Sequence, residues 1–280
     1  MPAVSLKQVR LRFGDILALD DVSFAVEEGE FVSLLGPSGC GKTTLLNVIG
    51  DLLAPSAGTI EIGGSSPAAM RLQRQIGFVF QRDTLLKHMP ALANVRLPMD
   101  IAGTPRKEAD AKARAALKLV GLEGREQSLP HHLSGGMRQR VAIARVFASD
   151  YRLLLMDEPF AALDAYNKLV MAEELLRIWQ EAGKRTTVIF VTHDWQEAAF
   201  LSDRVIFMSG SPGHVKAEIK IPFARPRSPE LRFSPEFVQM TNRLYNLYHQ
   251  PEEDDSGGKA ALPRSNTALP DPMAGGRETL

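Results

Sequence analysis

Residues 31–49 read FVSLLGPSGCGKTTLLNVI, and the change of pattern within them decides the fold. FVSLL is a continuous apolar run that stops at glycine, which is typical of a central strand buried on both faces. A helix is expected to begin at about Lys42 and to end near Pro55. Residues 36–44, between this strand and this helix, fit G-x-x-x-x-G-K-[ST]. That context favours a phosphate-binding loop over a glycine-rich turn with a chance lysine.

The loop carries groups suited to a nucleotide and its Mg²⁺. Gly36, Gly39 and Gly41 let successive backbone N–H groups converge on an anion, and the positive end of the following helix adds to the attraction. Lys42 is expected to reach the β- and γ-phosphates, and the Thr43 hydroxyl to take a Mg²⁺ position. The full set predicted to bind the nucleotide here is Gly36, Pro37, Ser38, Gly39, Cys40, Gly41, Lys42, Thr43 and Thr44.

Two further apolar strands end in chemically active side chains. RLLLMDE at 152–158 ends in Asp157, which can reach Mg²⁺ through water, and Glu158, which is placed to polarise an attacking water. TVIFVT at 187–192 is followed by His193. Taken alone, the two acids are equally a strand end in solvent. Because ligands of open α/β sheets bind at the carboxyl ends of parallel strands, the three strand ends together favour one site.

The composition excludes several classes of protein. The 33 basic and 33 acidic side chains of the 280 residues cancel, so no global field draws the chain to nucleic acid or to an anionic surface. The single cysteine, Cys40, excludes an internal disulfide and fits a reducing compartment. No apolar stretch approaches the roughly 18 residues that span a bilayer, and the N-terminus does not read as a signal peptide. We expect a soluble, cytosolic protein that acts on a membrane only through a partner.

The order of patterns predicts an α/β fold. Period-two apolar spacing at 4–13 and 18–26 predicts antiparallel strands, and strand–helix–strand alternation around a helical stretch predicts a parallel core with a helical insertion. We expect one domain over residues 1–250, its helical subdomain at about 82–150, and a disordered tail at 251–280, which is rich in Pro, Gly and Ser. The other expected strands are 59–64, 75–81, 204–210 and 213–222, and the other expected helices are 168–183, 195–203 and 234–248.

Five motifs together resemble the ATP-binding subunit of an ABC transporter. They are residues 36–44, Gln81, LSGGM at 133–137, LLLMDEPFAALD at 153–164 and His193, in the order and spacing of that family. The similarity covers roughly residues 4–245. It implies a P-loop NTPase (RecA-like) fold with a mostly parallel core and an N-terminal antiparallel β subdomain. The helical subdomain would lie between the Q-loop at Gln81 and the Walker B strand.

The resemblance also implies roles for individual residues. Gln81 looks like the Q-loop glutamine that senses Mg²⁺ and the γ-phosphate, and His193 like the switch histidine that binds the γ-phosphate. Asp164 looks like the D-loop residue that couples two sites, and Phe13 like the aromatic that stacks on adenine, although a strand-borne Phe is equally a core residue. Ser134, Gly135 and Gly136 would grip the ATP of a second copy. The implied catalytic set is Lys42, Gln81, Glu158 and His193, and the implied Mg²⁺ set is Thr43, Gln81 and Asp157.

The same resemblance implies the partners. They are ATP, Mg²⁺, a second copy of the chain, membrane permease subunits and, indirectly, an extracytoplasmic solute-binding protein, with the chain peripheral at the cytoplasmic face of the cell membrane. Residues 82–98 fall where such ATPases receive the permease. LSGGM, HDWQEAAFLSDRV and MSGSPGHV are similar to importers of nitrate, sulfonate and taurine, with sulfonate or taurine favoured. This link is associational, because the ATPase never touches the solute.

Other classes of function remain alternatives or are excluded. An exporter or lipid-extraction ATPase of the same superfamily stays open. A soluble ABC ATPase on DNA or ribosomes fits less well, because the chain has one ATPase half, no coiled-coil insertion and no basic excess. A GTPase would need N-K-x-D, which the sequence lacks.

Overall fold

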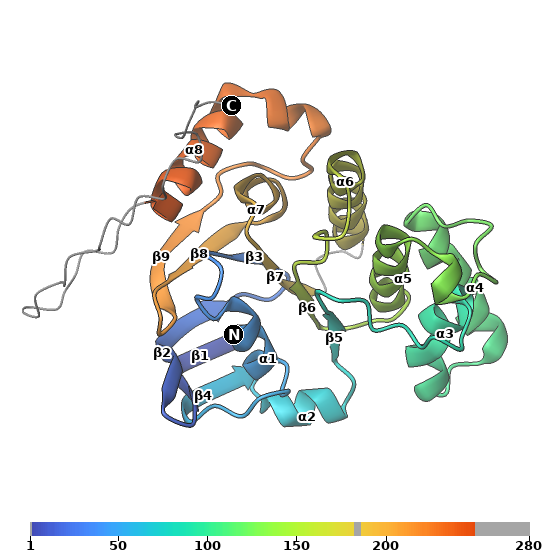
Figure 1. The fold of residues 1–280 in the computed structure, drawn as a ribbon, viewed down its shortest axis with the longest axis horizontal. Coiled ribbons are helices and arrows are strands. Elements are labelled where there is room, and N and C mark those ends of the chain that lie inside the picture. The colour runs from blue at the N-terminus through green and yellow to red at the C-terminus, as the bar shows by residue number, and fades with distance from the viewer. Residues whose placement is uncertain (1, 182–185, 250–280) are drawn as a thin grey trace, which may run out of the picture. The chain divides into compact units, whose positions relative to one another are not determined.

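The computed structural model describes residues 2–181 and 186–249 (Figure 1). The predicted tail at 251–280 lies outside the described residues. Within the described part of the chain, none of the helices combines the length and the apolar character needed to cross a bilayer.

The larger of two sheets has six strands in the order β5-β6-β7-β3-β8-β9. Its neighbours pair in parallel, except for the antiparallel pair of β8 and β9 at one edge. The mostly parallel core predicted from the sequence is therefore confirmed. The strands are β3 (Phe31–Leu35), β5 (Ile76–Val79), β6 (Leu153–Asp157), β7 (Thr187–Thr192), β8 (Arg204–Ser209) and β9 (His214–Lys220).

The smaller sheet is antiparallel and has the order β2-β1-β4. It contains β1 (Val4–Phe13), β2 (Ile16–Val26) and β4 (Ala57–Ile62). Its two N-terminal strands follow the predicted period-two spacing, with Val4, Leu6 and Val9 buried along β1. The antiparallel N-terminal sheet expected from the resemblance is present.

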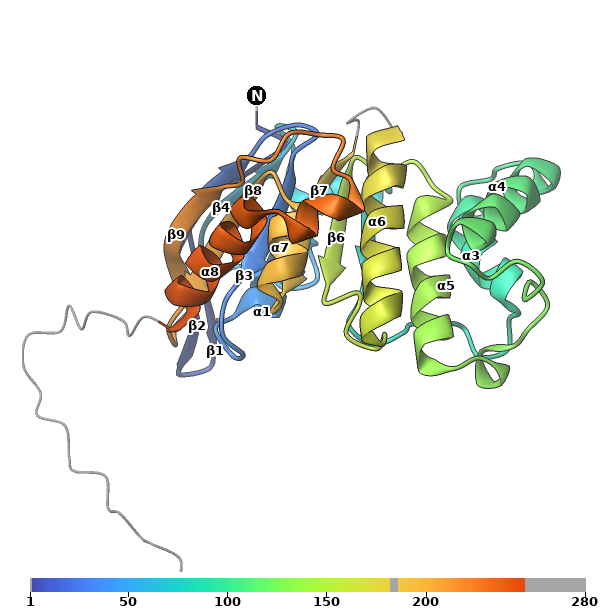
Figure 2. The same cartoon turned by 90° about the horizontal axis from the view of Figure 1, so that it is seen from above.

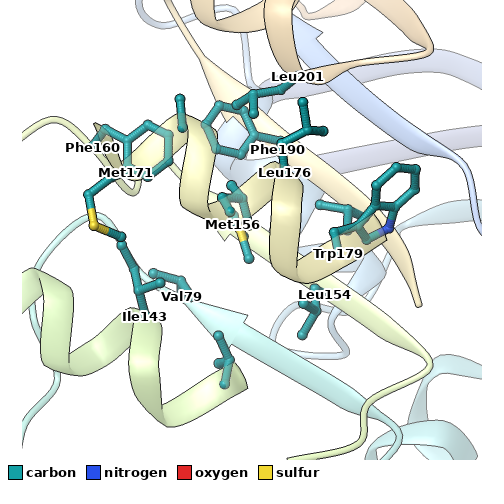
Figure 3. Close-up of a cluster of buried hydrophobic side chains, with 14 of the residues drawn as sticks. Val79, Ile143, Leu154, Met156, Phe160, Met171, Leu176, Trp179, Phe190 and Leu201 are labelled. Atoms are coloured by element: carbon teal, nitrogen blue, oxygen red, sulfur yellow. The ribbon is translucent and has the colours of Figure 1, made fainter. Parts of the chain in front are cut away.

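The large sheet separates two hydrophobic cores, which explains why the side chains of its central strands are buried on both faces and mostly apolar. On β3, Phe31 and Leu35 belong to one core and Val32 and Leu34 to the other. The first core packs α5, α6, α7 and α8 against the sheet, and Figure 3 shows part of it, where Phe160 and Met171 lie near Phe190. The second core packs α1 and the small sheet against the opposite face.

Eight α-helices and two 3₁₀ helices complete the described chain. Figures 1 and 2 show α3, α4 and α5 gathered beyond β5 and β6, away from the small sheet. The helices are α1 (Lys42–Ile49), α2 (Pro67–Leu72), α3 (Ala91–Ile101), α4 (Arg106–Leu119), η1 (Pro130–His132), α5 (Gly135–Phe147), α6 (Ala165–Glu181), α7 (Trp195–Leu201), η2 (Pro229–Phe233) and α8 (Pro235–His249).

Apart from shifts of about two residues at element ends, three helices differ from the sequence expectation. Helix α1 ends at Ile49 rather than near Pro55, because Asp51 adopts a left-handed φ of 58° that stops the helix. Helix α2 was not predicted; Ser66 caps it by accepting from the Ala69 N–H, and Pro67 occupies its first turn. Helix α6 begins at Ala165, upstream of the predicted start at residue 168.

Candidate functional site

The phosphate-binding loop connects β3 to α1 as predicted. Helix α1 begins after Gly41, whose φ of 90° is left-handed, and no side chain caps the helix. The N–H groups of its first turn therefore have no side-chain acceptor, which suits an anion such as a nucleotide phosphate. Lys42 is 6% exposed, and its Nζ donates to the carbonyl oxygens of Gly36 at 2.7 Å and Pro37 at 2.8 Å. These contacts place its charge at the centre of the loop.

A second loop, at residues 210–213, packs against the phosphate-binding loop. A Cβ built on Gly213 would lie 2.0 Å from the Cys40 carbonyl oxygen, so only glycine fits this contact. Gly213 also donates to the Ala18 carbonyl at 2.9 Å and accepts from the Asp20 N–H at 3.0 Å. The sequence analysis did not identify this loop as part of the site. Cys40 itself is buried, and burial raises the pKa of its thiol.

Thr43 and Asp157 meet where the sequence places the metal. The Thr43 hydroxyl donates to Asp157 Oδ1 at 3.0 Å, and Asp157 is 4% exposed at the end of β6. Burial raises the pKa of Asp157, the Thr43 hydrogen bond opposes that shift, and the neighbouring Glu158 charge adds to it. A buried carboxylate beside a hydroxyl and a second carboxylate is a set of hard oxygen donors, which fits Mg²⁺.

No group of three or more His, Cys, Asp or Glu side chains in the described residues could hold a metal by itself. Mg²⁺ usually takes one or two protein ligands and completes its shell with water and substrate phosphates. Gln81, the third predicted metal ligand, contacts Glu158 rather than Asp157 in this structure.

Glu158 brings two of the predicted catalytic residues together. Gln81 Nε2 donates to Glu158 Oε2 at 3.3 Å, and His193 Nδ1 lies 3.3 Å from the same oxygen. The three side chains come from the ends of β5, β6 and β7, three adjacent strands of the parallel part of the sheet. Glu158 has a left-handed φ of 43°, and its N–H donates to the Val191 carbonyl at 3.0 Å. A non-glycine residue held in this region is typical of functional sites.

The LSGGM segment starts α5, away from the phosphate-binding loop; in both views β6 lies between α1 and α5 (Figures 1 and 2). Ser134 caps α5, accepting from the Met137 N–H at 3.2 Å. A Cβ on Gly136 would lie 3.0 Å from Leu163 Cδ2 and 3.4 Å from the Ala162 carbonyl, so this glycine allows close packing on the D-loop.

Three side chains of α5 hold the segment that surrounds Gln81. Arg138 pairs with Asp83 at 2.9 Å, and Gln139 Nε2 donates to the Phe80 carbonyl at 3.1 Å. Arg145 contacts both the carbonyl and the hydroxyl of Thr84. The start of the predicted helical subdomain is thus tied to the Q-loop by side chains that sequence analysis did not single out.

Phe13 and Asp164 lie in the environments that the sequence allows for their predicted roles. Phe13 ends β1 and is 49% exposed, so the alternative of a core Phe is wrong. Asp164 Oδ1 accepts from the Asn167 N–H at 3.0 Å, which caps the start of α6 and holds the pKa of Asp164 low. Coupling of two sites by Asp164 stays a prediction.

Comparison with known proteins gives one consistent result. The family described as ABC transporter matches residues 19–161. An uncharacterized ABC transporter ATP-binding protein of Methanocaldococcus jannaschii is 44% identical over 232 residues, which are 83% of this chain and 84% of that protein. A taurine import ATP-binding protein of Roseobacter denitrificans is 38% identical over 268 residues, 92% of this chain and 98% of that protein.

Solved structures agree with the sequence comparison. The chain resembles a dimeric ATP-binding cassette in a post-hydrolysis state bound to ADP and Pi, with a TM-score of 0.70 and 36% identity. The match covers 79% of this chain and 100% of that one.

Proposed function

The chain belongs to the ABC transporter family as an ATP-hydrolysing subunit that binds ATP with Mg²⁺, and we propose that it powers import of a small anion through a separate membrane permease. The observation that carries the chemistry is the meeting of Gln81 and His193 at one oxygen of Glu158, beside the Thr43–Asp157 pair. We propose Lys42, Gln81, Glu158 and His193 as the catalytic residues.

The bound nucleotide would be held by the loop and by α1. Lys42 exchanges its contacts with the loop carbonyls for the β- and γ-phosphates, and the first-turn N–H groups of α1 complete the cradle. Thr43, Asp157 and Gln81 would hold Mg²⁺, which when bound neutralises charge on the β- and γ-phosphates. Phe13, half exposed at the end of β1, would stack on adenine.

Glu158 orients the attacking water. Its carboxylate is 20% exposed on the side chain, which leaves room for a water while the backbone is fixed by Val191. His193, 52% exposed on its side chain, is free to turn toward the γ-phosphate and to share the charge that develops there. Positioning and electrostatics supply most of the catalysis in phosphoryl transfer, so the geometry around Glu158 sets the rate.

A second copy of the chain would complete each site. Cassettes of this family dimerise, and a dimeric cassette is among the matched structures. Ser134, Gly135 and Gly136 open α5 toward an anion, while the same chain already has one phosphate-binding helix start at α1. Two phosphate-binding helix N-termini in one chain are explained if each binds a different ATP. Loss of a contact supplied in trans costs about 10³-fold or more in related phosphoryl transfers, so hydrolysis would depend on dimer closure.

The permease would dock on a groove beside the helical subdomain, at the cytoplasmic face of the membrane. Leu97 and Pro98, from the range predicted to receive it, line a groove of about 650 Å³ together with basic residues of α2 and α5. Leu85, Leu92 and Val95 of the same range are buried in the core, so they cannot contact a permease directly.

The solute that the relatives favour is taurine or another sulfonate, with nitrate next. Three matched taurine import ATP-binding proteins are 36–41% identical to this chain over most of its length. Deleting the gene and testing growth on taurine, an alkanesulfonate or nitrate as the sole sulfur or nitrogen source tests this proposal. Loss of growth on taurine alone supports it, and normal growth on all three refutes it. Reconstitution with the permease and a binding protein then decides between import and export.

A further inference from the structure

We infer that Glu197 and Thr192 are positioning residues for the switch histidine: the Thr192 hydroxyl ties the Glu197 carboxylate to the backbone N–H of Asp194, which fixes the chain on both sides of His193. The inference rests on the proposed role of His193 in hydrolysis and adds two residues that act through it. We call the set of Thr192, Asp194 and Glu197 the clasp.

The clasp is a continuous set of hydrogen bonds around one residue. Thr192 Oγ1 donates to Glu197 Oε2 at 2.7 Å and accepts from the Asp194 N–H at 3.0 Å. Asp194 Oδ1 accepts in turn from the N–H groups of Gln196 at 2.8 Å and Glu197 at 3.2 Å. The end of β7 is thereby joined to the start of α7, and His193 is the only residue between the two anchored positions Thr192 and Asp194.

The arrangement resembles a helix capping box with a hydroxyl inserted. In a capping box, the third helical residue, a Glu or Gln, accepts directly from the N–H of the cap residue. Here the Glu197 carboxylate reaches the N–H of the cap residue, Asp194, through the Thr192 hydroxyl. The insertion extends the cap by two residues toward β7, so that it encloses His193 as well as the helix start.

Glu197 is buried, and removing its carboxyl group from water costs free energy. The residue is 8% exposed, and burial raises the pKa of its carboxyl, with the Thr192 hydrogen bond opposing the shift. Asp194 adds repulsion, whereas His193 and Lys168 of α6 favour the charged form. A side chain can cap a helix while it stays in water, so capping alone does not require a buried carboxyl. Burial of Glu197 costs free energy, and the clasp gives that buried position a role.

The other groups that face Glu197 do not replace Thr192 as its partner. Lys168 and Arg232 line the same cavity of about 360 Å³ between α6, α7 and η2. Arg232 stacks over the Phe200 ring at 3.7 Å, and its buried Nε and Nη2 have no hydrogen-bond partner among the described residues. The Thr192 hydroxyl therefore carries the directional contact to the carboxylate.

The consequence falls on the distance between His193 and Glu158. The imidazole Nδ1 lies 3.3 Å from Glu158 Oε2, although the His193 side chain is half exposed and has room to turn away. A misplacement of about 1 Å at a catalytic group can lower turnover by about 10²-fold. Loss of the clasp should therefore lower kcat while ATP, held by the loop between β3 and α1, still binds.

Single variants give the first test, in the full-length chain, with its permease if the chain alone is inactive. Glu197→Ala and Thr192→Val should each lower kcat about tenfold or more, with the Kd for ATP unchanged within about twofold. Glu197→Gln keeps an acceptor oxygen and Thr192→Ser keeps the hydroxyl, so both should stay within about threefold of wild type. Equal loss in the conservative and the disruptive variants overturns the inference.

A double-mutant comparison separates positioning from stability. In a His193→Ala background, Glu197→Ala should cause no further loss of kcat, because the residue it positions is gone. A further loss by the same factor as in wild type overturns the inference alone. Wild-type turnover of His193→Ala overturns the proposed role of His193 as well. Ser234→Ala is the matched control, since it removes a cap hydrogen bond from α8 and should lower the melting temperature without changing kcat.

Discussion

Gly213 is a position outside the phosphate-binding loop at which one added methyl group should disturb the nucleotide site. A Cβ there would lie 2.0 Å from the Cys40 carbonyl oxygen, and such contacts essentially never fall below 3.0 Å. The Gly213→Ala variant must therefore separate the two loops by about 1 Å, a misplacement that can cost about 10²-fold in function. Because Cys40 belongs to the phosphate-binding loop, we expect ATP affinity to fall by that factor.

The loss can be measured in two ways. Calorimetric titration with a non-hydrolysable ATP analogue gives Kd directly. Thermal unfolding gives the stability that saturating ligand adds, and a Kd weaker by about 10²-fold lowers that added stability by about 2.7 kcal/mol. Without nucleotide, overpacking should cost about 1–3 kcal/mol. Gly124→Ala is the control, since Gly124 has a left-handed φ of 82° but no atom within 4 Å of the place that an added Cβ would take, so it should lower stability and leave Kd unchanged. A folded Gly213→Ala variant with Kd within about threefold of wild type refutes the reasoning.

Three further predictions address the site itself. Glu158→Gln should bind ATP and dimerise but lose about 10²–10⁴-fold in turnover, the usual share of a general base, and rapid hydrolysis would remove Glu158 from that role. Phe13→Ala should weaken ATP binding by about 1–3 kcal/mol if its exposed ring stacks on adenine; an unchanged Kd in titration argues that adenine lies elsewhere. Because the pKa of Asp157 is raised, the folded chain keeps a proton that the unfolded chain has released, and stability falls as pH rises from the ordinary value through the raised one. Asp157→Asn should therefore raise the melting temperature of the nucleotide-free protein at neutral pH and abolish the stabilisation by Mg²⁺; a lower melting temperature contradicts this.

Much of the fold follows from the sequence, because its strongest signals are local. The apolar run FVSLL predicts β3, and in the structure its apolar residues divide between the two cores. The same holds for TVIFVT in β7. The motif spacing then places Glu158 and His193 at neighbouring strand ends, as observed. Helix α2 was missed because six residues are too few for a clear apolar period, although Ser66-Pro67 is a valid start signal.

The parts of the site that sequence analysis missed depend on contacts between distant segments. Gly213 has no local signal, since its φ is ordinary and only the approach of Cys40 requires glycine. Glu197 has a partial signal, because Asp194 and Glu197 have the spacing of a capping box. The sequence does not indicate that the Thr192 hydroxyl would stand between them, because that depends on where β7 ends relative to α7.

The ties from α5 to residues 80–84 limit how such cassettes can be recombined. Consider a chimera that exchanges the helical insertion for that of a relative, with its junction just after residue 84. It would separate Arg138 from Asp83 and Gln139 from the Phe80 carbonyl. A junction placed before Phe80 would carry both halves of each contact. The natural crossover point therefore lies at or before the end of β5, upstream of the boundary that helix content alone suggests.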